Sequence, residues 1–409
     1  MSLLKGNAIV GQAGGPTAVI NQSLLGVIDE CLKHGHIGRL LGARNGLLGI
    51  VKEDFVNLKR QPDALLELIA ATPGAALGST RDKLNQAYAA RILETFRRND
   101  IRYFFYIGGN DSAFTVRAIQ KVAADARYDL RAMHIPKTID NDLLLNDHCP
   151  GFGSAARFVA MAFVGDNLDN RALSGIKINV LMGRDAGFIT AASVLARRHE
   201  DDGPHLIYLP ERTFDVPRFV SDVAGVVERY DRAVIAVSEG IRDDKGEYWT
   251  SRISQDIEQD SYGHVQLSGS GSLADFLAGT LRSNLPHGPW RIRADTFGYL
   301  QRSFPATISP IDAWEARLVG QMAVIYSLED IDAGSVVLTR LPGVTYACGT
   351  RLARLIDIAP DAPPFTKSLP DMYITEAGND INESYLPYVG PLVGELPQVG
   401  WFEQIAPGK

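Results

Sequence analysis

Short apolar runs alternate with segments of helical periodicity through the first 240 residues, and this alternation constrains the fold most strongly. The apolar runs, which predict buried strands, are residues 7–12, 103–107, 133–136, 177–182, 205–209 and 233–237. The segments with apolar residues at helical spacing, which predict helices, are residues 17–35, 112–126, 186–198 and 216–229. Parallel strands need long crossover connections that are usually helices, so the pattern predicts βαβ units and a mostly parallel sheet. We therefore expect an α/β fold whose ligands bind at the carboxyl ends of the strands.

The chain is longer than one ordinary domain. Its 409 residues predict two domains, because single hydrophobic cores stop growing at roughly 250–300 residues. Polar residues and glycines dominate residues 242–272, where we expect an insertion or a mobile loop. Several prolines mark the last forty residues, which we expect to be irregular and to fold back over the body of the protein.

The charge balance and the cysteine count exclude several classes of protein. A net charge of -7 disfavours a protein that coats nucleic acid or an anionic membrane, although a local cluster of Arg and Lys can still bind a small anion. The three cysteines, Cys31, Cys149 and Cys348, show no metal-binding spacing and predict reduced thiols. No apolar run approaches the roughly 18 residues of a membrane helix, and the N-terminus shows no signal-peptide pattern. We expect a cytoplasmic protein without nucleic-acid or membrane partners.

Two of the predicted strands end in paired glycines that open a helix. The pairs are Gly14-Gly15 and Gly108-Gly109, the second followed by Asn110, Asp111 and Ser112. Glycine lets backbone N–H groups approach an anion, and a helix N-terminus adds a favourable dipole. Any α/β turn can use glycine, but two pairs at strand ends of one sheet favour a phosphate site. Neither pair is followed by the Lys-Ser/Thr of a Walker P-loop.

The loop after the predicted strand 133–136 combines one lysine with two aspartates, at Lys137, Asp140 and Asp142. In isolation such aspartates are ordinary turn residues. Here they follow a strand of the sheet that also carries the glycine turns. One carboxylate can accept the proton of a substrate hydroxyl, a second can help to hold Mg²⁺, and a lysine can stabilise a phosphoryl group during transfer. The loop therefore predicts phosphoryl-transfer chemistry.

Five short segments resemble the signature segments of the phosphofructokinase family, in the same order and at suitable separations. They are "IGGNDS" (107–112), "PKTIDND" (136–142), "MGRDAGF" (182–188), "SEG" (238–240) and "FGYLQR" (297–302). The resemblance covers roughly residues 6–330 and is specific to the pyrophosphate-dependent branch of the family. It implies reversible transfer of a phosphoryl group from pyrophosphate to the 1-hydroxyl of fructose 6-phosphate, with Mg²⁺ as the cofactor.

Two positions distinguish this sequence from the ATP-using members of the family that it resembles. Those members carry glycine where this chain has Asp111 and Lys137. An aspartate side chain at position 111 would occupy and repel the space of a nucleotide α-phosphate, while the lysine at position 137 adds positive charge for pyrophosphate. One residue thus disfavours the nucleotide, and the other favours the smaller donor.

The same resemblance implies a fold of two Rossmann-like three-layer domains with mostly parallel sheets. Residues 1–149 with roughly 301–355 would bind pyrophosphate and Mg²⁺. Residues from roughly 150–300 with 356–409 would bind fructose 6-phosphate, with an insertion near 242–290.

The resemblance also assigns roles to individual residues. Asp140 would be the base that removes the proton of the 1-hydroxyl, with Thr138 beside it, and Asn110 and Asp142 would hold the metal. The residues assigned to pyrophosphate and the transferring phosphate are Gly14, Gly15, Arg81, Gly108, Gly109, Asn110, Asp111, Ser112 and Lys137. The residues assigned to the sugar phosphate are Thr138, Asp140, Met182, Gly183, Arg184, Glu239, Arg293, Tyr299 and Arg302.

Three departures from the family pattern bear on these roles. Asn110 stands where many members have a metal-binding acid, so ligation can shift toward the two aspartates of the loop and water. Gly175 stands where ATP-using relatives have a substrate arginine, and Lys177 is a candidate substitute. The insertion of roughly 242–290 separates "SEG" from "FGYLQR" further than in short bacterial relatives; within it "GHVQ" (263–266) mimics one form of the sugar-phosphate motif but is followed by Leu267 rather than arginine, so we prefer "FGYLQR".

The residues leave two alternatives for the function. One is an ATP-dependent phosphofructokinase that tolerates Asp111, and the other is a sugar-phosphate-binding regulator that has lost catalysis. The intact Asp140 argues against the regulator, because a pure binder needs no base. Sedoheptulose 7-phosphate is a second acceptor that such a pocket can admit. Bacterial relatives share some 6-phosphate contacts between subunits, which implies a homodimer or a homotetramer.

Overall fold

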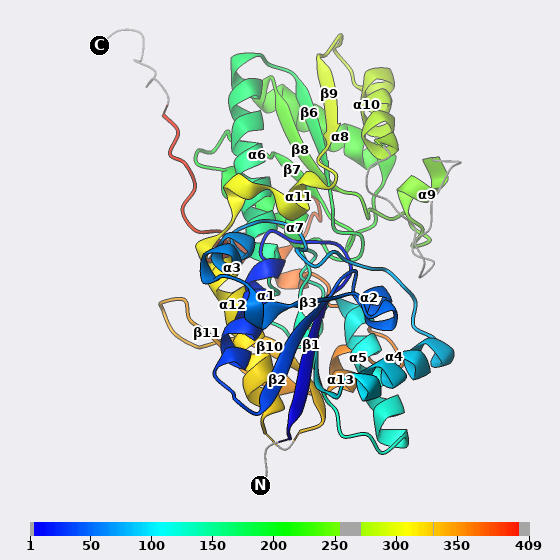
Figure 1. Ribbon diagram of the computed structural model, residues 1–409. Coiled ribbons are helices and arrows are strands. Elements are labelled where there is room, and N and C mark those ends of the chain that lie inside the picture. The colour runs from blue at the N-terminus through cyan, green and yellow to red at the C-terminus, as the bar shows by residue number, and fades with distance from the viewer. Residues whose placement is uncertain (1–3, 254–270, 330, 401–409) are drawn as a thin grey trace.

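The computed structural model describes residues 4–253, 271–329 and 331–400 (Figure 1). Strands from two distant parts of the chain form a seven-stranded sheet in the order β11-β10-β5-β4-β1-β2-β3. Its strands are β1 (Gly6–Gln12), β2 (Ile37–Ala43), β3 (Phe55–Asn57), β4 (Ile101–Gly108), β5 (Arg131–Pro136), β10 (Ala333–Arg340) and β11 (Cys348–Ala353). The pairs within the sheet are parallel, and the edge pairs β2–β3 and β10–β11 are antiparallel.

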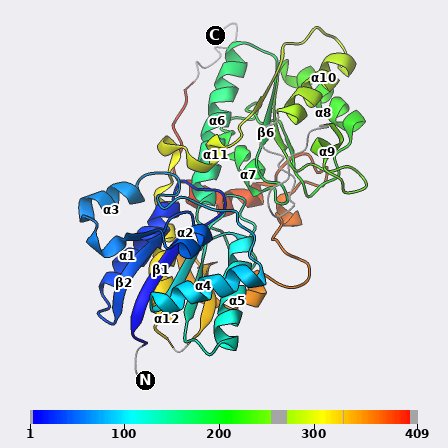
Figure 2. The ribbon, with the colours of Figure 1, turned by 45° about the vertical axis from the view of Figure 1, so that its right-hand side comes forward.

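A second sheet has four parallel strands in the order β7-β8-β6-β9. These strands are β6 (Ile176–Leu181), β7 (Leu206–Tyr208), β8 (Ala233–Ser238) and β9 (Ile292–Thr296). This sheet lies above the first one in Figure 1, and the two sheets remain separate in the rotated view of Figure 2. The expected α/β fold with mostly parallel sheets is confirmed, while the domain boundaries remain a prediction.

Both faces of the central strands are buried, which explains why their sequences are continuous apolar runs. In β4, Tyr103, Phe105 and Ile107 enter one core, while Phe104 and Tyr106 enter the core on the opposite face. Strand side chains alternate between the two faces, so helices must cover both of them.

Helices form a layer on each face of each sheet. On the large sheet, α1 and α12 share one core and α4 and α5 share the other, while α6 and α8 lie on opposite faces of the small sheet. The helices are α1 (Ile20–Leu32), α2 (Leu47–Lys52), α3 (Asp63–Ala70), α4 (Gln86–Arg98), α5 (Asn110–Asp125), α6 (Phe152–Ala172), α7 (Phe188–Ala191), α8 (Val216–Tyr230), α9 (Trp249–Ile253), α10 (Ser272–Asn284), α11 (Leu300–Ser303), α12 (Pro310–Ser327), α13 (Leu355–Ile358) and α14 (Leu386–Val393). None of the helices in the described ranges is both long enough and apolar enough to cross a membrane.

The expected helix over 186–198 is wrong in its length and type. The structure has only the single turn α7, followed by a 3₁₀ helix over Ala192–Ala196. Ser193 Oγ donates a hydrogen bond to Thr190 O at 2.6 Å, three residues earlier. Such a side chain competes with the backbone ladder and favours the tighter turn.

Two segments expected to be irregular contain helices. Within 242–272 the structure has α9, whose Trp249 stacks on Phe276 with ring centroids 5.5 Å apart. Within the last forty residues it has α14, which contributes Val389 and Leu392 to the core beside α6. Tertiary packing of these apolar side chains overrides the polar and proline-rich composition. The segment 263–266 lies outside the described residues.

Candidate active site

A cleft of about 750 Å³ lies at the carboxyl ends of strands from both sheets. The large sheet contributes residues that follow β1, β4 and β5, and the small sheet contributes residues that follow β6 and β8. The register pairs Gln12 with Ile107 and Gly108 with Pro136, so the three strands of the large sheet end level with one another. This common edge explains how turns that are far apart in the sequence meet in one site.

Most of the predicted site residues line this cleft. Those that do are Gly14, Gly15, Arg81, Gly109, Asn110, Asp111, Ser112, Lys137, Thr138, Asp140, Asp142, Met182, Arg184, Glu239, Tyr299 and Arg302. Gly108, Gly183 and Arg293 are not among the lining residues. Gly108 and Gly183 lie inside the turns that carry their lining neighbours, whereas Arg293 lies elsewhere.

The turn after β1 brings the backbone close to a cation. Gly14 has a φ of 75°, a left-handed conformation that glycine adopts at little cost. A Cβ atom at Gly15 would lie 2.9 Å from Arg302 Cζ, so glycine leaves room for the guanidinium group. Ser79 Oγ donates to Gly14 O at 2.6 Å, which ties this turn to the loop that carries Arg81.

The turn after β4 leads directly into α5, whose first residues line the cleft. A Cβ atom at Gly108 would lie 2.0 Å from Ser112 Oγ, so the tight start of the helix requires glycine there. His134, buried beneath this turn, has Nε2 2.9 Å from Gly108 O and Nδ1 2.8 Å from Ser335 Oγ. Burial lowers the pKa of His134 to about 4, so its neutral ring supports the strand end. Sequence reasoning missed this support because His134 lies within an apolar run.

Lys137 joins the two turns. Its side chain is buried, with 4% of the residue exposed, and its Nζ donates to Gly15 O at 2.7 Å. Burial, and then the charge of Arg302, lower the pKa of Lys137 to about 8. Burial also lowers the pKa of Arg302. Two desolvated cations that repel each other beside glycine turns form a site that a bound anion would stabilise.

Asp140 and Asp142 face the same cleft. Burial, and then the charge of Asp142, raise the pKa of Asp140 to about 6. Burial also raises the pKa of Asp142, although the hydrogen bond that Asp142 accepts from Thr138 acts in the opposite direction and lowers it. A carboxylate that ionises just below neutral pH and lies in a cleft has the properties of a general base.

The atoms around these carboxylates fit a divalent cation. Asp140 Oδ1 and Asn110 Oδ1 are buried and receive no hydrogen bond within the described part of the chain. Asn110 Nδ2 donates to Asp142 Oδ2 at 3.0 Å, so the amide directs its nitrogen to one carboxylate and leaves its oxygen for another partner. Mg²⁺ prefers such oxygen ligands and keeps several waters. Asn110, Asp140 and Asp142 are therefore the residues that could hold it.

The small sheet contributes two lining residues that sequence reasoning missed, Asp185 and Tyr248. Asp185 accepts hydrogen bonds from Arg184 Nε at 2.9 Å, from Tyr248 OH at 2.6 Å and from Arg242 Nη2 at 2.6 Å. Asp185, the next residue in the chain, thus fixes the side chain of Arg184 at the cleft. The adjacency of Asp185 to Arg184 was a usable signal, whereas Tyr248 lies in the segment expected to be a loop.

Arg302 and Arg293 occupy different environments although the resemblance assigns both to the sugar phosphate. Arg302 Cζ lies 4.7 Å from the centroid of the Tyr299 ring and contacts the turn at Gly15. Arg293 is exposed on β9, and its Nη1 donates to the carbonyl of the preceding residue at 3.1 Å. Lys177, the candidate substitute for a substrate arginine, pairs instead with Asp295. Neither Arg293 nor Lys177 reaches the cleft of its own chain.

Comparison with known proteins gives consistent matches along almost the whole chain. The family described as phosphofructokinase matches residues 7–326. A pyrophosphate–fructose 6-phosphate 1-phosphotransferase from Rhodospirillum rubrum is 50% identical over 392 residues, which are 96% of this chain and 95% of that protein. A protein of the same name from Xanthomonas campestris is 37% identical over 405 residues, which are 97% of this chain and 93% of that protein. The crystal structure of a pyrophosphate-dependent phosphofructokinase from Marinobacter aquaeolei superimposes with a TM-score of 0.83 and 31% identity, covering 98% of this chain and 94% of that chain.

Proposed function

This chain belongs to the phosphofructokinase family, and we propose that it transfers a phosphoryl group reversibly from pyrophosphate to the 1-hydroxyl of fructose 6-phosphate. The products are fructose 1,6-bisphosphate and phosphate. The observation that carries the choice of donor is the pair Asp111 and Lys137, which line one cleft with the glycine turns. Lys137 provides positive charge for a small polyanion, and Asp111 adds negative charge at the first turn of α5.

Asp140 acts as the base in this proposal. Its carboxylate takes the proton of the 1-hydroxyl while the hydroxyl oxygen forms a bond to the transferred phosphorus. The bond between that phosphorus and the bridging oxygen of pyrophosphate breaks, and the leaving phosphate keeps the electron pair. Lys137 stabilises the charge that develops on the phosphoryl oxygens, supported by its buried position and its hydrogen bond to Gly15 O, and Arg81, which lines the same cleft, would contact the transferring phosphate. In the reverse direction Asp140, now protonated, returns the proton to the sugar oxygen.

Asn110, Asp140 and Asp142 would hold Mg²⁺, as the free oxygens at Asn110 and Asp140 support. When bound, the cation would neutralise part of the charge of pyrophosphate. Thr138 would keep its neighbours oriented, since its Oγ1 accepts a hydrogen bond from Asp140 N at 3.1 Å. The backbone of Gly14, Gly15 and the turn at 108–112 would contact the remaining phosphate oxygens.

The sugar phosphate would bind on the side of the cleft that Met182, Arg184 and Glu239 form. Tyr299 and Arg302 would contact the 6-phosphate, and Gly183 would shape the turn before Arg184. Sedoheptulose 7-phosphate, which differs by one carbon, is a second acceptor for the same pocket.

Arg293 supports an oligomeric enzyme. It does not line the cleft of its own chain, yet the resemblance assigns it to the 6-phosphate. We infer a homodimer or homotetramer in which a second copy brings Arg293 to the site. The enzyme would work in the cytoplasm, where its free thiols at Cys31, Cys149 and Cys348 would stay reduced.

A matrix of donors and acceptors tests this proposal. Pyrophosphate and ATP are each assayed with fructose 6-phosphate and with sedoheptulose 7-phosphate, using wild type, Asp111→Gly, Lys137→Gly and the double variant. We expect wild type to use pyrophosphate, Asp111→Gly to gain measurable ATP activity, and Lys137→Gly to lose pyrophosphate activity. The two substitutions should be non-additive, because they shape one site. Wild type that prefers ATP would make it an ATP-dependent enzyme, and wild type inactive with every pair would make it a regulator.

A further inference from the structure

Asn141 lies between the two carboxylates of the loop 137–142 but faces away from the cleft. Asp140 and Asp142 line the cleft, whereas Asn141 is fully buried and does not. Its backbone is left-handed, with a φ of 59°, a conformation that asparagine adopts more readily than most residues and that turns its side chain away from those of its two neighbours. The direction of both carboxylates therefore depends on what holds Asn141.

A tyrosine from α14 holds one end of the Asn141 amide. Asn141 Nδ2 donates to Tyr388 OH at 2.7 Å, and Tyr388 OH donates to Asp147 O at 2.7 Å. One hydroxyl thus joins the side chain between the carboxylates to the backbone that follows the loop. Both hydrogen bonds have good length, and replacement by phenylalanine would leave a buried amide N–H without its partner.

A lysine from the preceding irregular segment holds the other end. Lys367 Nζ donates to Asn146 O at 2.9 Å and to Asp147 O at 2.8 Å, and lies 3.4 Å from Asn141 Oδ1. The backbone N of Lys367 also donates to Asp142 O at 2.7 Å. The side chain therefore spans the loop from Asn141 to its far end, and the main chain is attached to one of the two carboxylate residues.

We propose that Lys367 and Tyr388 are positioning residues, which fix Asn141 and thereby direct Asp140 and Asp142 into the cleft. The inference rests on the proposed function for its kinetic consequence, but the contacts themselves do not depend on which acceptor is used. Neither side chain lines the cleft, so each side chain acts through Asn141, while the main chain of Lys367 contacts Asp142 directly. A misplacement of catalytic groups by about 1 Å can reduce turnover about 10²-fold.

Tyr388→Phe is the main test, and Tyr385→Phe is its matched control. Tyr385 belongs to the same aromatic cluster, 5.7 Å from Tyr388 between ring centroids, and its hydroxyl donates to Phe188 O at 2.8 Å without touching the loop. We expect Tyr388→Phe to lower kcat about 10- to 100-fold, with less than about threefold change in either KM, while Tyr385→Phe keeps kcat within about twofold. Lys367→Met, which keeps the length of the side chain, should lower kcat in the same way and serves if Tyr388→Phe fails to fold.

Hydrogen exchange gives a second readout that needs no substrate. Peptides covering 137–142 should exchange faster in Tyr388→Phe and Lys367→Met than in Tyr385→Phe. Two results would overturn the positioning role. In one, exchange rises in Tyr388→Phe and Lys367→Met but their kcat is unchanged. In the other, their kcat falls no more than that of Tyr385→Phe. Wild type that is inactive with pyrophosphate would instead overturn the proposed function, and the exchange comparison would still decide whether these residues hold the loop.

Discussion

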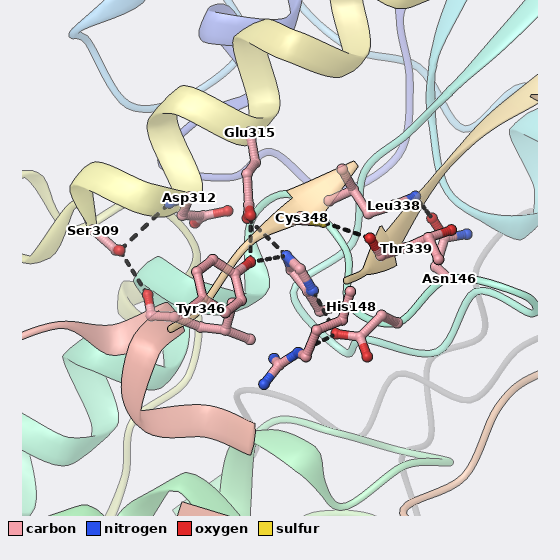
Figure 3. Close-up of polar contacts among 12 residues, drawn as sticks. Asn146, His148, Ser309, Asp312, Glu315, Leu338, Thr339, Tyr346 and Cys348 are labelled. Atoms are coloured by element: carbon pink, nitrogen blue, oxygen red, sulfur yellow. Dashed lines mark hydrogen bonds and ion pairs between the residues drawn. The ribbon is translucent and has the colours of Figure 1, made fainter. Parts of the chain in front are cut away.

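Two clusters of buried and partly buried polar side chains contain similar residue types but differ in how their polar atoms are satisfied. The cleft cluster consists of Asn110, Lys137, Asp140, Asp142 and Arg302. The interior cluster consists of Asp147, His148, Glu315, Arg340 and Tyr346, and most of its contacts appear in Figure 3. The cleft cluster has two buried oxygens without donors. In the interior cluster, each carboxylate and each ring nitrogen has a partner within the described residues.

The contacts of the interior cluster form a closed network. His148 Nδ1 lies 2.8 Å from Asp147 Oδ1, and its Nε2 lies 2.7 Å from Glu315 Oε2. Tyr346 OH donates to Glu315 Oε1, and Arg340 Nε donates to Asp147 Oδ1 at 3.2 Å. The network joins the segment after the loop 137–142 to α12 and to the connection between β10 and β11 (Figure 3).

The interior cluster could be mistaken for a metal site. Ligand atoms of His148, Glu315 and Cys348 lie within 4.8 Å of one another. However, both nitrogens of His148 are already hydrogen-bonded, and the weak donor Cys348 Sγ lies 3.5 Å from Thr339 O. We therefore assign the cluster a structural role. The two clusters contain similar residue types, so residue types alone do not indicate a ligand site. What distinguishes the cleft cluster is that it has buried acceptor oxygens without donors beside charged side chains.

The largest expected effect comes from Asp140→Asn. Turnover should fall about 10²–10⁴-fold, because the base is lost. The same change should raise the free energy of unfolding at pH 7 by about 1–3 kcal/mol in buffer without divalent cations. The reason is that the pKa of Asp140 rises from 3.8 to about 6 on folding, so its ionised form opposes folding. This cost to wild type is present above pH 6 and disappears as the pH falls to 3.8. Urea unfolding of both proteins at pH 7 and pH 4 therefore tests whether Asp140→Asn is the more stable protein at pH 7 and loses that advantage at pH 4. A variant less stable than wild type at pH 7 would contradict it.

Glu315→Ala should reduce stability and leave turnover unchanged, the reverse of what we expect for Asp140→Asn. It leaves His148 buried without one partner, so the free energy of unfolding should fall by about 3–5 kcal/mol, while kcat per folded molecule stays unchanged. Burial opposes the charged form of His148, but its hydrogen bonds to Asp147 and Glu315 raise its pKa above the ordinary 6.5. The loss of free energy of unfolding in Glu315→Ala, relative to wild type, should therefore be largest below pH 6.5. It should shrink as the pH rises through the raised pKa that His148 has in the folded protein. Glu383→Ala, at an exposed glutamate, is the control. Equal stability of both variants would refute the structural role.

Arg302→Ala should weaken sugar-phosphate binding. A charge-assisted hydrogen bond contributes about 1.5–3 kcal/mol, so the KM for fructose 6-phosphate should rise about 10- to 100-fold. The KM for pyrophosphate should change less, although the contact with Gly15 places Arg302 close to the donor turn. Steady-state kinetics with each substrate varied separately measure both constants. A change confined to pyrophosphate would show that Arg302 belongs to the donor site alone.

The pH profile of kcat/KM should be bell-shaped. Activity should fall as the pH drops through the pKa of Asp140, which is about 6 without metal and which bound Mg²⁺ would lower, and as the pH rises through about 8, where Lys137 loses its proton. Each limb approaches about a tenfold change per pH unit. The acid limb should be absent from the residual activity of Asp140→Asn, and its persistence there would assign it to another group.

Cys348→Ser should have the smallest effect. The thiol contacts two carbonyls, Thr339 O and Gly349 O, each only weakly at 3.5 Å, so the free energy of unfolding should change by less than about 1 kcal/mol, with activity unchanged. Elemental analysis of wild type purified without chelators provides the sharper measurement. If wild type contains a stoichiometric transition metal that Cys348→Ser lacks, the interior cluster is a metal centre. The contrast between a ligand-binding cleft cluster and a purely structural interior cluster would then be wrong.

Much of the candidate site follows from local sequence patterns. The glycine turns and the loop 137–142 follow predicted strands, and parallel neighbours end at one edge, so their meeting could be expected. The pattern could not place Arg293, which lies nine residues before Arg302 in the sequence although the two side chains lie in different environments. Nor could it predict that α7 ends after one turn, because that depends on a hydrogen bond from Ser193.

The sequence by itself determined the alternation of strands and helices, the positions of the turns and the chemistry of Lys137, Asp140 and Asp142. These features depend on periodicity, backbone preference and side-chain type, which act over a few residues. Only the tertiary structure decided which buried polar groups are satisfied and what supports the loop 137–142. Tyr388 and Lys367 reach Asn141 across 247 and 226 residues of chain. Such contacts arise when distant segments pack into one core, and no local pattern in the sequence encodes which atoms will meet.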